Sequence, residues 1–228
     1  MTIIVFLFGL PIIIALILSY SFIINIFTQK ITISLFFLFG FLLYFVIYIK
    51  GIAHKEINKI YITIHEITHA IFGIFSFNIP RKIIIKKTNG YVEFNKKINP
   101  LIAISPYIFP TLNVIIAIIY FLLKTKLKND YVYIFLFLQG FFIAFHIINT
   151  AEVITINQKD FKAIGGKSIS LIMITALNLG IVAIFLMLIF SKSNHIIPFL
   201  KNTINLYFTI LAKIFNFFMY LPNSIFQQ

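Results

Sequence analysis

The sequence contains no cysteine among its 228 residues, and its 6 acidic residues are far fewer than its 19 Lys and Arg. Without cysteine the chain has no disulfides and no thiolate metal ligands. Charged residues make up only 11% of the chain, whereas 61% of its residues are hydrophobic. Soluble domains average about 45–50% apolar residues. The composition therefore predicts that the bilayer is the solvent of this protein.

The net charge of +13 does not indicate a nucleic-acid partner. The basic residues do not form one patch, because they lie near the ends of apolar segments, at 50–59, 81–97, 124–128 and 159–167. Basic residues beside apolar spans are typical of membrane proteins that face anionic lipid. We expect membrane lipid as a partner, and no nucleic acid.

Six apolar stretches are long enough to be spanning helices, which need about 20 mostly apolar residues. They cover 2–27, 31–49, 56–77, 101–123, 131–155 and 168–191. The first lacks a basic start and a small-residue cleavage site, so we interpret it as an uncleaved membrane helix. A further stretch, 195–220, carries a polar residue at every fourth position from Lys201 to Lys213. This spacing predicts an amphipathic helix that lies at the membrane interface or lines a polar cavity.

Residues 82–95, KIIIKKTNGYVEFN, differ from the apolar stretches on either side. Asn89-Gly90 between two β-prone runs is a strong hairpin signal, because both residues accept positive φ. The sequence thus predicts an all-α polytopic membrane protein with about six transmembrane helices, an amphipathic C-terminal helix and a small β-hairpin near 82–95. Because this loop is the most basic one, the positive-inside rule places it in the cytoplasm.

The stretch HEITHA places three ionisable groups, His65, Glu66 and His69, in the third apolar segment. On a helix the two histidines share a face and can bind one metal ion, while Glu66 can reach a water on that metal. This is the HExxH arrangement of zinc hydrolases. Ionisable groups inside a membrane are expensive and usually functional. We therefore expect His65 and His69 as metal ligands and Glu66 as a general base.

A catalytic zinc usually has three protein ligands and one open position. The residues themselves leave the third ligand open among Asp160, which follows the fifth span, and His146 and Glu152, which lie in it. Asn149 would otherwise help to orient a ligand or stabilise an oxyanion. Four residues of the fifth span fall close to one helical face: Gln139, His146, Asn149 and Glu152. We expect them to line a polar cavity.

Four stretches, taken in order, make the chain resemble the site-2 protease family of intramembrane zinc metalloproteases, especially its compact bacterial branch. The resemblance runs from about Glu56 to Leu186. The matching elements are HEITHA, the strand region KIIIKKTNGYVEF, Ser105-Pro106-Tyr107 through Asn113, and Asn157-Gln158-Lys159-Asp160 followed by Gly165-Gly166. The last stands where the family has Asn-x-x-Pro…Leu-Asp-Gly, but it lacks the Pro before Asp160 and the Gly directly after it.

The resemblance implies a zinc metalloendopeptidase in the bacterial cell membrane that cuts transmembrane or membrane-associated proteins. One Zn²⁺ would be held by His65, His69 and Asp160, and Glu66 would activate a water molecule. The chain would then divide into two N-terminal membrane helices at 1–50, the metalloprotease core at 51–191 and the amphipathic segment at 192–228.

A membrane-spanning substrate must unwind before it is cut, because a helix satisfies its own backbone groups. The unwound segment needs new hydrogen-bond partners, which the edge of the hairpin would supply by strand addition. The residues expected to offer this edge are Tyr91, Val92, Glu93 and Phe94.

A metal-binding or metal-transporting membrane protein without protease activity is the alternative, because acids and histidines in membranes also mark ion paths. The first two spans and the sixth are almost free of polar residues. A polar route through both halves of the membrane is therefore not visible in the sequence, and a blind cavity suits hydrolysis better.

Overall fold

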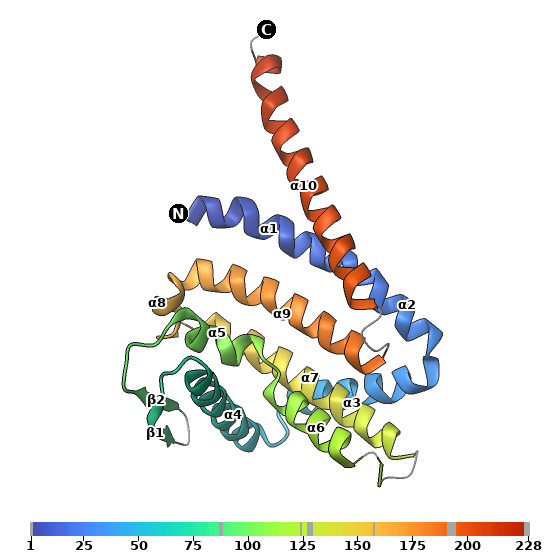
Figure 1. Ribbon diagram of the computed structural model, residues 1–228, viewed down its shortest axis with the longest axis vertical. Helices are drawn as coiled ribbons and strands as arrows, with labels where there is room; N and C mark the ends of the chain where they lie inside the picture. The colour runs from blue at the N-terminus through green and yellow to red at the C-terminus, as the bar shows by residue number, and fades with distance from the viewer. Residues whose placement is uncertain are drawn as a thin grey trace. The chain divides into compact units, whose positions relative to one another are not determined.

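The computed structural model describes residues 2–86, 89–123, 125–126, 130–156, 158–190 and 195–225. Apart from one β-hairpin, the regular structure of these residues is helical (Figure 1). The helices are α1 (Thr2–Ser19), α2 (Ser21–Gln29), α3 (Ile31–Ile49), α4 (His54–Phe75), α5 (Pro100–Ile108), α6 (Thr111–Leu123), α7 (Tyr131–Thr155), α8 (Phe161–Ile164), α9 (Lys167–Phe190) and α10 (Ile196–Ile225). The strands are β1 (Pro80–Ile85) and β2 (Gly90–Phe94).

Four stretches are long and apolar enough to cross a membrane, and they fall within or close to four of the predicted spans. They are Val5–Gln29, Ile31–Ile49, Tyr131–Thr155 and Lys167–Phe190. Helices α5 and α6 meet at an angle of 71° and add a fifth candidate if the bent pair crosses as one span. The prediction of a mainly helical protein with helices long and apolar enough to cross a membrane is confirmed, but the count of six spans is not.

Two local features explain the difference from six straight spans. The predicted span 101–123 bends because Phe109 adopts an extended conformation before Pro110, which has no N–H to continue a helix. Helix α4 is not among the candidate spans. Its first turns carry Lys55, Glu56 and Lys59, which lower its hydropathy.

The chain forms two compact units, one of Met1–Gln29 with Thr175–Gln228 and one of Lys30–Ile174. In the second unit α3 and α7 approach closely. A Cβ atom on Gly40 would overlap the backbone of Phe137 on α7, and one on Gly140 would overlap the backbone of Phe37 on α3. Small residues at such a crossing let two membrane helices pack backbone to backbone. This pair supports Tyr61 of α4 in a buried cluster with Tyr44, Ala144 and Phe145.

The predicted β-hairpin is confirmed, with β1 and β2 antiparallel and Ile85 paired with Gly90. The prediction that Asn89-Gly90 forms the turn is wrong for Gly90, which is the first residue of β2 and not one of the positive-φ glycines. The connection instead spans 86–89, where the Lys86 N–H donates to the Asn89 carbonyl at 2.8 Å. Residues 87 and 88 lie outside the described residues.

A buried asparagine closes the base of the hairpin. The Asn78 amide donates to the carbonyls of Lys96 and Lys97 at 3.1 and 3.4 Å, and its oxygen accepts the Lys96 N–H at 3.1 Å. These bonds hold the chain entering β1 against the chain leaving β2.

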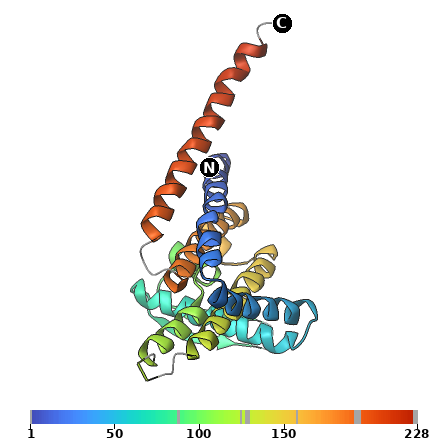
Figure 2. The same ribbon diagram turned by 90° about the vertical axis from the view of Figure 1, so that its right-hand side faces the viewer.

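In the unit of Met1–Gln29 and Thr175–Gln228, α10 is one continuous helix (Figures 1 and 2). Its Asn202 and Thr203 donate to the Ser19 hydroxyl oxygen of α1 at 3.1 and 2.8 Å. The predicted polar stripe is a different set of α10 side chains, from Lys201 to Lys213, and these are exposed. The stripe therefore does not line a cavity within this unit.

Candidate metal centre

Helix α4 runs without a break through HEITHA and presents both histidines on one side. The His65 and His69 side chains are 11% and 8% exposed. Their rings meet edge to face with centroids 4.9 Å apart. The predicted spacing of one helical turn therefore places two largely enclosed imidazoles beside each other.

Asp160 completes the group from a distant part of the chain, directly before the short helix α8. Its Oδ2 lies 3.8 Å from His65 Nε2 and 3.4 Å from His69 Nε2. One ligand atom from each of the three residues lies within 4.8 Å of the others. Two ligand atoms that are each about 2 Å from a tetrahedral zinc lie about 3.3 Å apart. The two distances to Asp160 are close to this value, and imidazole nitrogen and carboxylate oxygen are donor types that zinc accepts, so the group could hold a metal ion.

The carboxylate of Asp160 is ionised in this surrounding. Burial alone would raise the pKa of Asp160, but the two imidazoles beside it outweigh burial and hold the pKa well below its ordinary value. The side chain makes no capping hydrogen bond to α8. Asp160 is therefore directed to the histidines rather than used as a helix cap.

A backbone carbonyl orients His69. Its Nδ1 lies 2.7 Å from the Ile102 carbonyl oxygen of α5. A carbonyl can only accept, so this contact places a proton on Nδ1 and directs Nε2 towards Asp160. Asn99 caps α5 by accepting the Ile102 N–H at 2.8 Å, which fixes the start of the helix.

Tyr107, which also lies on α5, holds Asp160. The Tyr107 hydroxyl donates to Asp160 Oδ2 at 2.9 Å. Sequence reasoning named Tyr107 only as part of the resemblance and missed this contact. The available signal was a tyrosine in an apolar helix, because a buried tyrosine hydroxyl usually has a hydrogen-bond partner.

Glu66 packs against β2 of the hairpin. It is 6% exposed, and a Cβ atom on Gly90 would lie 2.6 Å from Glu66 Cγ and 3.0 Å from a methyl of Ile62. Phe94, at the other end of β2, is so close to Gly73 of α4 that a Cβ there would overlap its ring. Strand β2 therefore lies along α4 next to HEITHA.

The residues predicted as a substrate strand are those of β2. Tyr91 and Glu93 are exposed, and Val92 and Phe94 are half-buried. The sheet has two strands among the described residues, so the outer edge of β2 has no strand paired to it there.

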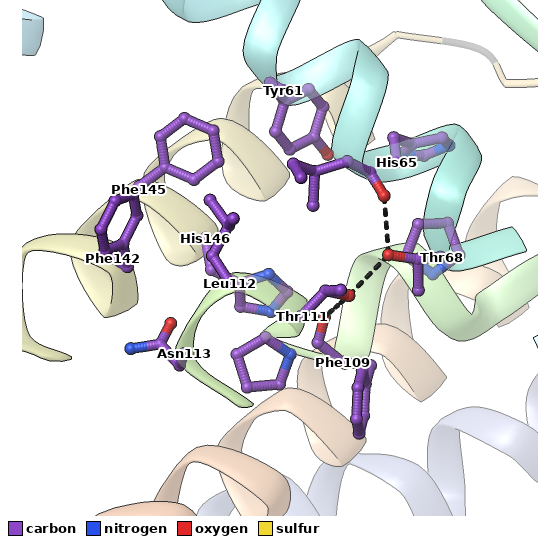
Figure 3. Close-up of a pocket in the computed structure, with 13 residues that line it drawn as sticks. Tyr61, His65, Thr68, Phe109, Thr111, Leu112, Asn113, Phe142, Phe145 and His146 are labelled. Carbon is purple, nitrogen blue, oxygen red and sulfur yellow. Dashed lines mark hydrogen bonds between the residues drawn. The ribbon is translucent and has the colours of Figure 1, made fainter. Parts of the chain in front are cut away.

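The other candidate ligands lie outside the group of three. Asn149 donates to the Tyr44 hydroxyl, and Glu152 accepts from the Tyr48 hydroxyl at 3.2 Å, so both contact α3. Asn157 lies outside the described residues. His146 lines a small pocket together with His65 (Figure 3).

This pocket lies beside His65 and contains several polar groups. His65 of α4 and Asn113 of α6 each bring a buried polar atom that has no hydrogen-bond partner among the described residues. Of the α7 residues predicted to line a polar cavity, His146 alone lines this one. Gln139 instead exchanges hydrogen bonds with Asn113 at 2.8 and 3.1 Å.

Comparison with protein-family models, with curated proteins and with solved structures finds no match for this chain. The resemblance to site-2 proteases therefore stays an expectation based on the motifs. A function can be proposed from the geometry of the three ligands and Glu66.

Proposed function

We propose that this chain is a membrane-embedded zinc metalloprotease that hydrolyses peptide bonds of transmembrane or membrane-associated proteins. The observation that carries the proposal is the group His65, His69 and Asp160, whose ligand atoms lie within 4.8 Å of one another. Three protein ligands with a further position open to water are typical of catalytic zinc, whereas structural zinc sites have four. Glu66, directly after His65, adds a carboxylate at such a site.

His65, His69 and Asp160 would hold the zinc ion, which would act as a Lewis acid that polarises the scissile carbonyl and makes a bound water more acidic. The role of Glu66 is to accept the proton of the attacking water and to return it to the leaving amine. Asp160 contributes negative charge to the ligand set. Ile102 and Tyr107 hold His69 and Asp160 in place from α5.

The neighbouring hairpin supports a protein substrate. Extended peptides bind to sheet edges through main-chain hydrogen bonds, and β2 lies against Glu66 through Gly90. Tyr91 and Glu93 are exposed on this strand. A substrate segment added to β2 would bring its backbone close to the general base.

The test uses detergent-purified protein and fluorescently labelled casein, an unstructured protein whose peptide bonds need no unwinding. We expect cleavage by the wild type and a loss of about 10²–10⁴-fold in Glu66→Gln, because a general base contributes rate enhancement of that order. Glu66→Gln keeps the three ligands, so its zinc content should equal that of the wild type. Equal cleavage by wild type and Glu66→Gln would contradict the assigned base. Zinc uptake into sealed vesicles without any cleavage would favour the transporter alternative.

A further inference from the structure

The placement of Asp160 needs an anchor from outside its own segment. Asp160 lies between α7 and the four-residue helix α8, and its side chain makes no capping bond to that helix. Its side chain is 20% exposed, more than either histidine. A carboxylate at the end of a connecting segment can rotate unless another group fixes it.

Tyr107 is suited to be that anchor because its ring is held on several sides. The residue is fully buried. Its ring meets the His65 ring edge to face at 5.0 Å, and it lies 5.6 Å from the ring of Phe161, the residue after Asp160. Packing of this kind leaves the hydroxyl little freedom to move away from Asp160.

The hydroxyl contacts the oxygen that matters for metal binding. Tyr107 donates at 2.9 Å to Oδ2, and the same Oδ2 is the atom closest to both histidines. A carboxylate oxygen has two lone-pair sites, so it can accept from Tyr107 and still present a lone pair to a metal. Since Ile102 orients His69, helix α5 orients two of the three ligands.

We propose that Tyr107 is a positioning residue of the metal centre, whose hydroxyl fixes Asp160 Oδ2 towards His65 and His69. This inference rests on the metal site of the proposed function but does not require protease activity. Groups that hydrogen-bond to metal ligands fix ligand orientation, and their loss typically weakens metal binding by 10–100-fold.

The test is the zinc affinity of detergent-purified Tyr107→Phe, measured by competition with a chromophoric chelator. This variant removes one hydroxyl and keeps the ring. We expect its dissociation constant for zinc to rise about 10–100-fold. Tyr44→Phe is the matched control, because Tyr44 is also fully buried and its hydroxyl also has a side-chain partner, Asn149, which is not one of the three candidate ligands. Its zinc affinity should stay within about twofold of the wild type.

A second measurement separates positioning from a general loss of structure. In an Asp160→Ala background, Tyr107→Phe should weaken zinc binding no further, because its effect acts through Asp160. Cobalt bound in place of zinc should also show a changed visible spectrum in Tyr107→Phe alone. Wild-type affinity in Tyr107→Phe, or an equal loss in Tyr44→Phe, would overturn the assignment. If the wild type binds no zinc, both the metal site and this role of Tyr107 are wrong, whereas zinc binding without casein cleavage would contradict only the protease.

Discussion

At the scale of single residues, Gly90 connects the hairpin to Glu66, the proposed general base. A Cβ atom there would lie within 3.0 Å of Glu66 and Ile62, and no metal ligand is among its three nearest atoms. The Glu66 side chain is the flexible neighbour, so it would have to move. We expect Gly90→Ala to keep wild-type zinc content and to lower casein cleavage by roughly tenfold or more, because a small misplacement of a catalytic group is costly.

Gly180→Ala is the control for this prediction, because a Cβ on Gly180 meets only a Leu16 methyl at an ordinary 4.0 Å. Its cleavage rate should match the wild type. Full activity in Gly90→Ala would show that the contact between β2 and Glu66 does not position the base.

The sequence predicts the local part of this site and not the tertiary part. The spacing of His65 and His69 is a property of one helix, so the pattern alone predicts that they share a face. Asp160 is more than ninety residues away, and only the resemblance favoured it over His146 and Glu152. The contacts of Ile102 and Tyr107 depend on where α5 packs, which no local pattern encodes.

At the scale of secondary-structure elements, Asn78 holds the hairpin closed. Its side chain makes three hydrogen bonds to Lys96 and Lys97 while it is 5% exposed. Asn78→Ala leaves those backbone groups unpaired, which destabilises the closed hairpin by about 1–3 kcal/mol. We expect trypsin to cut after the basic residues of β1, Arg81 and Lys82, several-fold faster in this variant than in the wild type.

Asn58→Ala is the control, because among the described residues the Asn58 side chain bonds to the exposed His54 and not to the hairpin. Trypsin should cut this variant at the wild-type rate. An unchanged digestion rate in Asn78→Ala would contradict the claim that Asn78 holds the two ends of the hairpin together.

The elements also show why turn and packing details were harder to predict than helices. The β-prone runs correctly predicted two paired strands, but Gly90 belongs to β2, where its missing side chain leaves room for Glu66. Similarly, the apolar runs predicted α3 and α7, while the close approach at Gly40 and Gly140 depends on which helices meet.

At the scale of the whole molecule, composition predicts the environment better than the path of the chain through it. The hydrophobic content of 61% indicates a membrane protein, and four stretches meet the length and hydropathy of a span. The count of six crossings is not confirmed, because apolar length alone does not reveal the bend between α5 and α6 or the polar start of α4. Both departures lie in the segments that carry Glu66, Ile102 and Tyr107.

Binding of a catalytic zinc by His65, His69 and Asp160 is tested by the zinc content of the detergent-purified protein, measured by mass spectrometry. The wild type should contain about one zinc per chain, and Asp160→Ala much less. Asp130→Ala, which changes an exposed aspartate without a capping bond, should keep the wild-type content. A folded wild type that holds no zinc even after zinc is supplied, or equal zinc in Asp160→Ala, would contradict this site.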